Sequence, residues 1–378
     1  MRFTVLECKS NLDTQGSGVL LQPVGLLILE RLGIRQEAEL LGHKIKRITG
    51  RSTPSNRITV NVDYQVLRGT DYSLGIDRKA LWELLCMKAV EAGATIETGI
   101  SVSQLKYQPN GLVSVVADDG DKLYPHFELV IDASGAFSQL RQYSIFPVSS
   151  QLLQYGSLWC KINLDKDSPY NTDTMLLYTD KNNVGIGLMP TGRTSPTAPE
   201  LITLFFNLNW KNCPNWNIDI FQQWKQGIVK EWPDTQHLLD QLHHYNQLYL
   251  AKFKQHTLPK PYGDRIAYIG DSAHATNPQL GQGINMSLID AVSLPWALEK
   301  EADLERALKL YSKVRRNHVA IYQTLARALT QFYQSDDQVA ITLRDAFYPV
   351  LSKLFLMKTA TAYLVSGQVG RPLKHLNR

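Results

Sequence analysis

The feature that most constrains this chain is a glycine-rich turn between a short apolar run and a helical pattern. Residues 265–271 read Arg-Ile-Ala-Tyr-Ile-Gly-Asp, which is typical of a buried strand that ends in a carboxylate. Gly281 and Gly283 follow, and a helix is predicted from about Ile284 to Leu298. A strand, a turn and a helix in this order predict one unit of an open α/β sheet, where ligands lie at the carboxyl ends of strands.

This turn has the composition of a ligand site. Asp271 can accept hydrogen bonds from a polyol such as a ribityl chain. Gly281 and Gly283 carry no side chain, so backbone can approach a flat ring. The helix that follows begins with unpaired N–H groups and the positive end of its dipole, which favours an anion. A reduced flavin is the anion that fits, because such a helix start would stabilise its negative charge.

The segment from Gly270 to Ala291 resembles the second FAD-binding motif of class A flavoprotein monooxygenases, the family of p-hydroxybenzoate hydroxylase and the ubiquinone-biosynthesis hydroxylases. The resemblance implies that Asp271 binds the ribityl chain and that Pro278 lies beside the isoalloxazine ring. It also implies that backbone lines the ring at Gly281, Gln282, Gly283, Ile284 and Asn285.

Three further segments match the same family in the same order. Glu7 ends a β-prone run and resembles the acidic residue that binds the adenosine ribose, although any strand can end in Glu. Arg78, in the first turn of a helix predicted from Asp77, corresponds to an arginine that contacts FAD, and a solvated helix arginine is an open alternative. Residues 132–141 resemble the third motif, which lies near the pyrophosphate and is linked to NAD(P)H use.

The chain departs from the family in two places. The family begins with a strand, a GxGxxG turn and a helix, whose N–H groups neutralise the pyrophosphate. No segment here matches that turn, since Gly16-Ser-Gly18 follows Glu7. We therefore expect a gap in the sheet or weak FAD binding, and a gene model begun at an internal Met would explain it. The Asp-Gly of the third motif is Ser134-Gly135 here, a variant similar to halogenases and prenyl reductases.

The fold class expected is mixed α/β: an incomplete Rossmann-like FAD-binding domain interleaved with an antiparallel-sheet substrate domain, plus C-terminal helices. Alternating apolar residues at Tyr72, Leu74 and Ile76 predict a strand of the second, more solvent-facing sheet. The FAD-binding domain is predicted at 1–57, 77–150 and 258–300, the substrate domain at 58–76 and 151–257, and the helical region at 301–378.

Composition limits the partners. The net charge of +5 is spread along the sequence and predicts no nucleic-acid or anionic-membrane footprint. The four cysteines are far apart and indicate neither a zinc site nor a disulfide framework, so a cytoplasmic protein without a leader is expected. No apolar stretch is long enough to span a bilayer, but the tail near residues 351–356, broken by Lys353 and Lys358, is a candidate to lie on a membrane or a partner.

Other candidate sites receive ordinary structural interpretations. His274 is expected to pair with backbone in the turn, and the adjacent His243 and His244 to lie on the surface. GxSxG is absent, which argues against a hydrolase. The tryptophans are expected in the core, with Trp159 a candidate to face an aromatic substrate.

The function predicted is that of a FAD-dependent monooxygenase that uses O2 and NAD(P)H to hydroxylate or epoxidise an aromatic or unsaturated small molecule. No general base is identified. A halogenase is an alternative, against which the absence of WxWxIP counts, and a prenyl-type reductase stays open. The alternative from another class is a truncated remnant without turnover.

Overall fold

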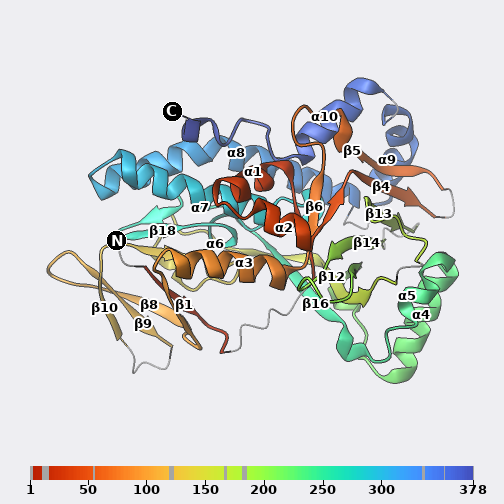
Figure 1. Ribbon diagram of the computed structural model, residues 1–378, viewed down its shortest axis with the longest axis horizontal. Helices are drawn as coiled ribbons and strands as arrows, with labels where there is room; N and C mark the ends of the chain where they lie inside the picture. The colour runs from red at the N-terminus through yellow and green to blue at the C-terminus, as the bar shows by residue number, and fades with distance from the viewer. Residues whose placement is uncertain are drawn as a thin grey trace.

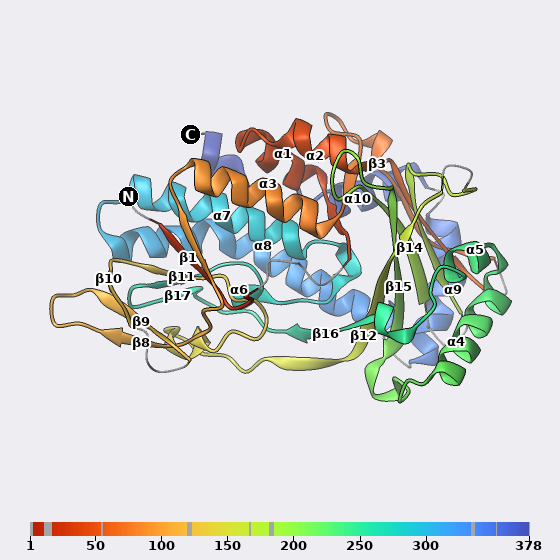
Figure 2. The same cartoon turned by 60° about the horizontal axis from the view of Figure 1, so that its bottom comes forward.

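The computed structural model describes residues 3–10, 17–53, 56–118, 123–165, 168–180, 185–333, 337–352 and 354–377. It has two regions along its long axis (Figure 1): helices layered over short strands, and a region built on one large sheet. Figure 2 shows the chain passing between them more than once. The fold is the mixed α/β class that the sequence predicts. Gly16 and Lys353 lie outside the described residues.

The parallel strands form two separate pairs. These are β1 (Thr4–Glu7) with β7 (Thr95–Thr98), and β11 (Val130–Asp132) with β18 (Ile266–Tyr268), to which β17 (Tyr262–Gly263) adds an antiparallel edge. Among the described residues, no strand joins the two pairs. Leu6 nevertheless packs on the apolar cluster that contains Ile266, so both pairs border one core.

The exposure of these strands is unusual for a parallel sheet. Val5 on β1 is 44% exposed and Ile131 on β11 is 42% exposed. Inner strands of a parallel sheet are ordinarily buried on both faces. Each of the two separate pairs therefore has an edge strand with a solvent-exposed apolar side chain.

A small antiparallel sheet lies under three helices. Its strands are β2 (Val19–Leu21), β6 (Ser73–Ile76) and β3 (His43–Ile45), and the helices are α1 (Pro23–Arg31), α2 (Arg35–Leu41) and α3 (Arg78–Glu91). Asp77 caps α3, because its side chain accepts hydrogen bonds from the N–H groups of Lys79 and Ala80. The sequence predicts that residues 72–76 belong to the second, more solvent-facing sheet, and this prediction is wrong. The strand formed there, β6, lies between β2 and β3 in the small sheet, and its residues are buried. The backbone of β14 approaches it, since a Cβ on Gly75 would come 2.1 Å from the Pro190 carbonyl oxygen.

The large sheet has seven strands in the order β16-β12-β15-β14-β13-β4-β5. Their bounds are β4 (Arg47–Ser52), β5 (Ile58–Asp63), β12 (Gln151–Asn163), β13 (Thr174–Thr179), β14 (Gly185–Gly192), β15 (Leu201–Asn209) and β16 (Tyr249–Gln255). Neighbours are antiparallel except β13 and β4. The predicted antiparallel sheet is thus present. β4 shares it with β5, although the boundary predicted at residues 57–58 separates them.

Alternation of side chains gives this sheet two apolar faces. Leu188 and Leu204 pack on one face with α4 (Ile218–Glu231) and α5 (Gln236–Leu239). Met189 and Phe205 point to the other face, which α10 (Phe355–Val365) covers together with α9 (Gln338–Leu351).

The remaining elements complete the first region. Two long helices, α7 (Gly283–Lys300) and α8 (Leu304–Tyr333), pack against each other, after the short α6 (Asp271–His274). A three-stranded sheet contains β8 (Val102–Tyr107), β9 (Val113–Ala117) and β10 (Leu123–Phe127). None of the helices in the described part of the chain is both long and apolar enough to cross a membrane.

Candidate cofactor site

Gly270 opens the turn that follows β18. Its φ is +61°, in the left-handed region, and a Cβ there would come 2.6 Å from Ser287 Oγ. Its N–H donates to Asp290 Oδ2 at 2.8 Å. Backbone conformation and space therefore both demand glycine immediately before Asp271.

Asp271 lies beside the N-terminus of α7. A Cβ on Gly283, the first residue of α7, would lie 4.0 Å from Asp271 Oδ1. Desolvation by surrounding protein raises the pKa of Asp271, while the charges of His274 and Arg78 act in the opposite direction. Because the residue is also solvent-exposed, it lies on a wall that is crowded on the protein side and open on the other. Arg78 is exposed at the first position of α3, near enough for its charge to act on Asp271.

The turn before α7 is shaped by η6 (Pro278–Leu280) and Gly281. Pro278 takes the first position of η6, and Gly281 has a φ of +59°. A Cβ on Gly281 would meet Leu20 Cδ2 at 3.8 Å, so the turn lies against β2. Asn277 ties it to α8 by donating from Nδ2 to the Ala326 carbonyl oxygen at 3.0 Å.

Side chains of the predicted ring-lining positions hold the turn in place. Asn285 is fully buried, accepts the Gln22 N–H at 2.9 Å, and donates to the carbonyl oxygens of Leu20 (3.1 Å) and Gly281 (2.9 Å). Gln282 donates from Nε2 to the Val365 carbonyl oxygen at 2.6 Å. Ile284 packs against the core around α1. These side chains are engaged with the protein, so the groups of this turn that a ligand would contact are those of its backbone.

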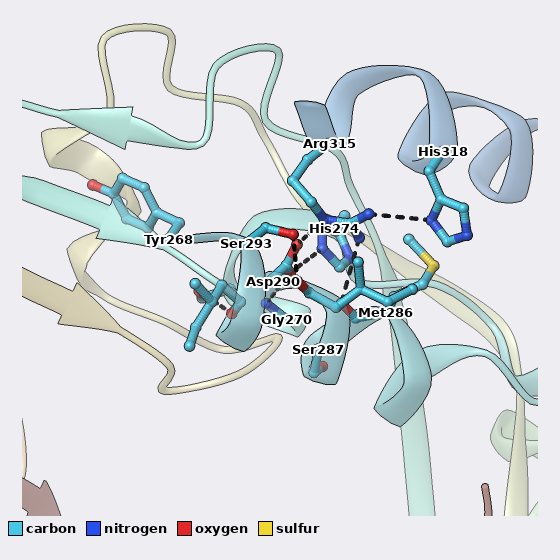
Figure 3. A network of polar contacts seen from close by, with 12 residues as sticks. Tyr268, Gly270, His274, Met286, Ser287, Asp290, Ser293, Arg315 and His318 are labelled. Atoms are coloured by element: carbon cyan, nitrogen blue, oxygen red, sulfur yellow. Dashed lines mark hydrogen bonds and ion pairs between the residues drawn. The ribbon is translucent and has the colours of Figure 1, made fainter. Parts of the chain in front are cut away.

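A buried polar network supports the turn from behind (Figure 3). Asp290 Oδ2 lies 2.6 Å from His274 Nε2, and Asp290 Oδ1 accepts from Arg315 Nε at 2.5 Å. Arg315 Nη1 lies 3.3 Å from His318 Nδ1, and His318 Nε2 lies 3.0 Å from the Gly367 carbonyl oxygen. Together with the bond to the Gly270 N–H, these contacts fix α6 to α7 and α8.

The electrostatics of this network are those of a paired buried charge. Burial alone would raise the pKa of Asp290, but the Arg315 and His274 charges and their hydrogen bonds hold it well below its usual range. Burial, helped by the Arg315 charge, lowers the pKa of His318 to about 3. Asp290 is therefore an anion at neutral pH, and His318 is neutral.

The sequence predicted part of this arrangement. His274 is structural as expected, but its ring contacts a carboxylate, and its backbone oxygen accepts from Gln323 Nε2 at 2.7 Å. Sequence reasoning missed Arg315, His318 and Gln323, which belong to the buried face of α8. The available signal was spacing, because Arg315 and His318 follow Leu308 and Tyr311 at helical intervals. His243 and His244 are exposed, as predicted.

Glu7 is placed in the other parallel pair. It ends β1, and its Oε1 accepts the Lys9 N–H at 2.9 Å. Burial, and less strongly the Glu7 charge, raise the pKa of Cys86 on α3, so Glu7 faces that helix. Arg78 is thus near enough to Asp271 for its charge to lower the pKa of that carboxyl, and Glu7 is near enough to Cys86 for its charge to raise the pKa of that thiol.

The loop after β11 lies against α6 and presents an exposed aromatic ring to a half-buried lysine of β16. The Asp132 carboxylate accepts from Ser134 N and from the Ser138 hydroxyl, and its carbonyl oxygen accepts from Ser272 Oγ at 2.6 Å. Phe137 is 61% exposed, with Lys254 Nζ 3.9 Å from its ring centroid. Burial lowers the pKa of Lys254, and the nearby Arg141 charge lowers it further.

An apolar sheet face adjoins the cofactor turn. Leu20, which borders Gly281, belongs to the same cluster as Met189 and Phe205, and Trp159 packs on Phe205 with ring centroids 5.1 Å apart. We call Leu20, Trp159, Met189 and Phe205 the substrate face. The Trp159 Nε1 is buried, with no hydrogen-bond partner in the described part of the chain. No cluster of three metal-ligating side chains occurs among the described residues.

Known proteins match both the sequence and the fold. The family model described as FAD binding domain matches residues 1–325. 6-Methylpretetramide 4-monooxygenase of Streptomyces rimosus is 27% identical over 302 residues, 77% of this chain and 68% of that protein. 3-Hydroxybenzoate 6-hydroxylase 1 of Aquipseudomonas alcaligenes is 23% identical over 362 residues, 91% of this chain and 86% of that protein.

Solved structures share the fold at lower identity. Klebsiella pneumoniae HpxO, complexed with FAD and uric acid, has a TM-score of 0.77 at 17% identity and covers 98% of each chain. P. aeruginosa PqsL, in complex with 2-aminobenzoylacetate, has a TM-score of 0.74 at 17% identity and covers 90% of this chain and 92% of its own. The chain belongs to the FAD binding domain family, and its relatives identify it as a FAD-dependent monooxygenase of the aromatic-hydroxylase class.

Proposed function

We propose that this monooxygenase uses O2 and NAD(P)H to hydroxylate a small aromatic or unsaturated molecule between the cofactor turn and the substrate face. The observation that carries the proposal is the approach of Gly281 to Leu20, whose Cδ2 would lie 3.8 Å from a Cβ on Gly281, because Leu20 belongs to an apolar cluster that contains aromatic side chains. The relatives named above include a 3-hydroxybenzoate hydroxylase and a pretetramide monooxygenase, and both names denote aromatic substrates.

The turn fits FAD. Among the described residues, and apart from its chain neighbours and the backbone of its own helix, a Cβ on Gly283 would have only Asp271 Oδ1 within 4 Å, so there is room beside the helix start. A bound FAD, reduced by NAD(P)H, would allow one atom of O2 to be transferred to the substrate while the other leaves as water. We assign Asp271 to the ribityl hydroxyls, Pro278 to the ring edge, and backbone from Gly281 to Asn285 to the ring. The first turn of α7 has no acidic residue, so its N–H groups favour negative charge on the bound ring.

Two assignments extend this site toward the nucleotide half of FAD. Arg78 lies close enough to lower the pKa of Asp271, and its exposed guanidinium suits a phosphate oxygen. Glu7 ends β1, where a carboxylate can accept hydrogen bonds from a ribose. Both remain assignments by resemblance and position.

The two separate parallel pairs support a further parallel strand as part of the working enzyme. The exposed Val5 and Ile131 belong to strands of the two separate pairs, and a strand between β1 and β11 would cover both. A GxGxxG turn at its carboxyl end would bring N–H groups to the pyrophosphate. We therefore propose that a strand, turn and helix of this kind complete the cofactor site.

The loop after β11 is our candidate for the reductant. Its exposed Phe137 ring and the cations of Lys254 and Arg141 offer a stacking surface and two phosphate ligands next to α6. We also propose a cytoplasmic location, because a reducing compartment suits the four free cysteines.

Flavin binding tests the cofactor assignment. The purified chain is titrated with FAD while flavin fluorescence is recorded, with Asp271→Ala beside it and the exposed Asp240→Ala as the matched control. Loss of charge-assisted hydrogen bonds should weaken affinity roughly 10- to 150-fold in Asp271→Ala, with no change in the control. Equal affinities in both variants would remove Asp271 from the site.

Turnover tests the reaction. NAD(P)H oxidation is followed with a panel of phenols and aminobenzoates, and products are identified by mass spectrometry for one added oxygen atom. If the purified chain binds no flavin, it is compared with a version that carries any residues that the gene encodes upstream. Failure of both versions to hold flavin would support the non-catalytic alternative.

A further inference from the structure

The surface of α9 and the following turn is apolar and exposed. Its side chains are Val339, Leu343, Phe347, Val350, Leu351, Leu354, Phe355 and Leu356, and we call them the α9–α10 surface. The first four positions recur at intervals of three and four residues, so they share one face of α9. Exposure is greatest at the start of α10, where Phe355 is 76% and Leu356 78% exposed.

The opposite side of the same hairpin is held on the protein. Tyr348 Oη accepts the Asn61 N–H of β5 at 3.0 Å, and Arg344 Nη1 donates to the Phe332 carbonyl oxygen at 2.9 Å. Ala362 and Val365 of α10 are buried in the cluster that contains the substrate face. The inner sides of α9 and α10 therefore pack on the large sheet and its surroundings, and the α9–α10 surface is their outer side.

The size of this surface is unusual for a lone monomer. The exposed parts of Phe347 and Phe355 alone amount to roughly 200–340 Å², if a phenylalanine presents 150–250 Å². Six aliphatic side chains add to them. The largest apolar patch on a typical monomer is roughly 300–600 Å², and larger ones mark protein or membrane contacts.

Charge distinguishes these two kinds of partner. From Ala346 to Lys358, where the most exposed apolar side chains of this surface lie, the charged residues are Lys353 and Lys358, whereas Asp337 and Asp345 lie just before α9 and in its middle. The overall net charge, which predicts no footprint for an anionic membrane, does not reflect this local pair of cations. Lys353 and Lys358 belong to the α9–α10 segment itself. The apolar turn from Val350 to Leu356 has these two cations as its nearest charged residues in the sequence, which suits the anionic surface of a bilayer.

Shape favours the same partner. α9 and α10 lie at one end of the molecule (Figure 1), and the most exposed side chains stand at the turn between them. A projecting apolar turn can enter a deformable lipid layer. We propose that the α9–α10 surface docks this protein on an anionic lipid bilayer, with Phe355 and Leu356 inserted and the helices lying on the membrane.

Docking would deepen the proposed function, on which this step rests. Val365 of α10 accepts from Gln282 Nε2 at 2.6 Å, next to the start of α7, and packs in one cluster with Met189 and Phe205. Because α10 packs on the substrate face, docking of the α9–α10 surface would bring this face close to the lipid. The substrate class that this arrangement fits is an apolar aromatic or unsaturated molecule dissolved in the membrane.

The test is sedimentation of the purified full chain with vesicles of phosphatidylcholine, with and without phosphatidylglycerol. The wild type should sediment with the anionic vesicles. The double variant Phe355→Ser/Leu356→Ser should have a partition coefficient at least about tenfold lower. Burial of one such apolar side chain contributes about 1.5–3 kcal/mol, and a tenfold change in partition corresponds to about 1.4 kcal/mol. Leu40→Ser, which alters an 81% exposed leucine on α2, is the matched control and should bind like the wild type. Lys358→Ala should weaken binding to anionic vesicles only.

Other outcomes overturn the proposal. These are wild-type protein that stays in the supernatant with both vesicle types, or a double variant that binds as well as the control. If the wild type is a dimer by light scattering and the double variant a monomer, without vesicle binding, the surface is a subunit interface instead. Flavin content and thermal unfolding are measured on every variant, so loss of cofactor or fold is separated from loss of membrane binding.

Discussion

Arg315 Nε donates to Asp290 Oδ1 over 2.5 Å, and both side chains are almost inaccessible to solvent. The two residues join α8 to α7, and the other oxygen of the same carboxylate holds the Gly270 N–H. The position of the cofactor turn therefore depends on an ion pair that lies behind it.

Removing the cation should be strongly destabilising. Arg315→Met leaves the Asp290 carboxylate buried without its ion-pair partner, which should lower the free energy of unfolding by about 3–5 kcal/mol. Urea unfolding followed by circular dichroism measures the change. Lys309→Met, which removes an exposed ion pair with Glu305 on the same helix, is the control and should leave the midpoint unchanged. A similar effect in both variants would contradict this prediction.

Acid should destabilise the protein partly through His318. Burial holds the pKa of His318 to about 3, whereas an unfolded histidine has a pKa of about 6.5. Between these values the unfolded state binds the extra proton, so stability is lost as the pH falls, by about 1.4 kcal/mol per pH unit for this residue. Asp290 acts in the same direction below about pH 4, because its pKa is depressed in the folded state.

The measurement is the urea midpoint as a function of pH. His318→Gln should reduce the slope by about one proton between roughly pH 6 and 4.5, whereas the exposed His243→Gln should not. An unchanged slope in His318→Gln would show that this histidine is protonated in the folded protein.

Asn285 should couple stability to flavin affinity. Asn285→Ala leaves the Gln22 N–H and the Leu20 carbonyl oxygen without their buried partner, at about 1–3 kcal/mol for each group. Because the same side chain holds Gly281, FAD affinity should fall as well. Asn217→Ala removes only the cap of α4, so it should lower stability by about 1 kcal/mol and spare FAD affinity. Isothermal titration with FAD distinguishes the two variants.

Two glycines with positive φ should respond differently to alanine. Gly270→Ala adds a contact at 2.6 Å from Ser287 Oγ to the strain of its backbone conformation, and should reduce soluble yield or thermal stability severely. Gly135 has a φ of +86°, and no atom of the described residues beyond its chain neighbours lies within 4 Å of an added Cβ, so Gly135→Ala should lose only about 1–2 kcal/mol. Equal melting temperatures would show that Ser287 yields without penalty.

The sequence by itself determined the elements whose signals are contiguous. The turn from Gly270 to Asn285 was predicted because one short stretch contains the strand, the glycines with positive φ and the helix start. The cap at Asp77 and the start of α1 at Pro23 were predictable for the same reason, since a helix end is set by neighbouring residues. The antiparallel sheet was predictable from alternation within each strand.

Only the tertiary structure decided which distant residues meet. Alternation at Tyr72 to Ile76 indicated a strand but not its partners, and β6 lies between β2 and β3 because helices and β14 enclose that sheet. Arg315 is buried because Asp290, on the preceding helix, compensates its charge. Phe355 is exposed because α10 packs on the large sheet through its opposite side, at Ala362 and Val365. Local propensity depends on neighbours in the chain, whereas burial and charge pairing depend on neighbours in space, which the fold alone supplies.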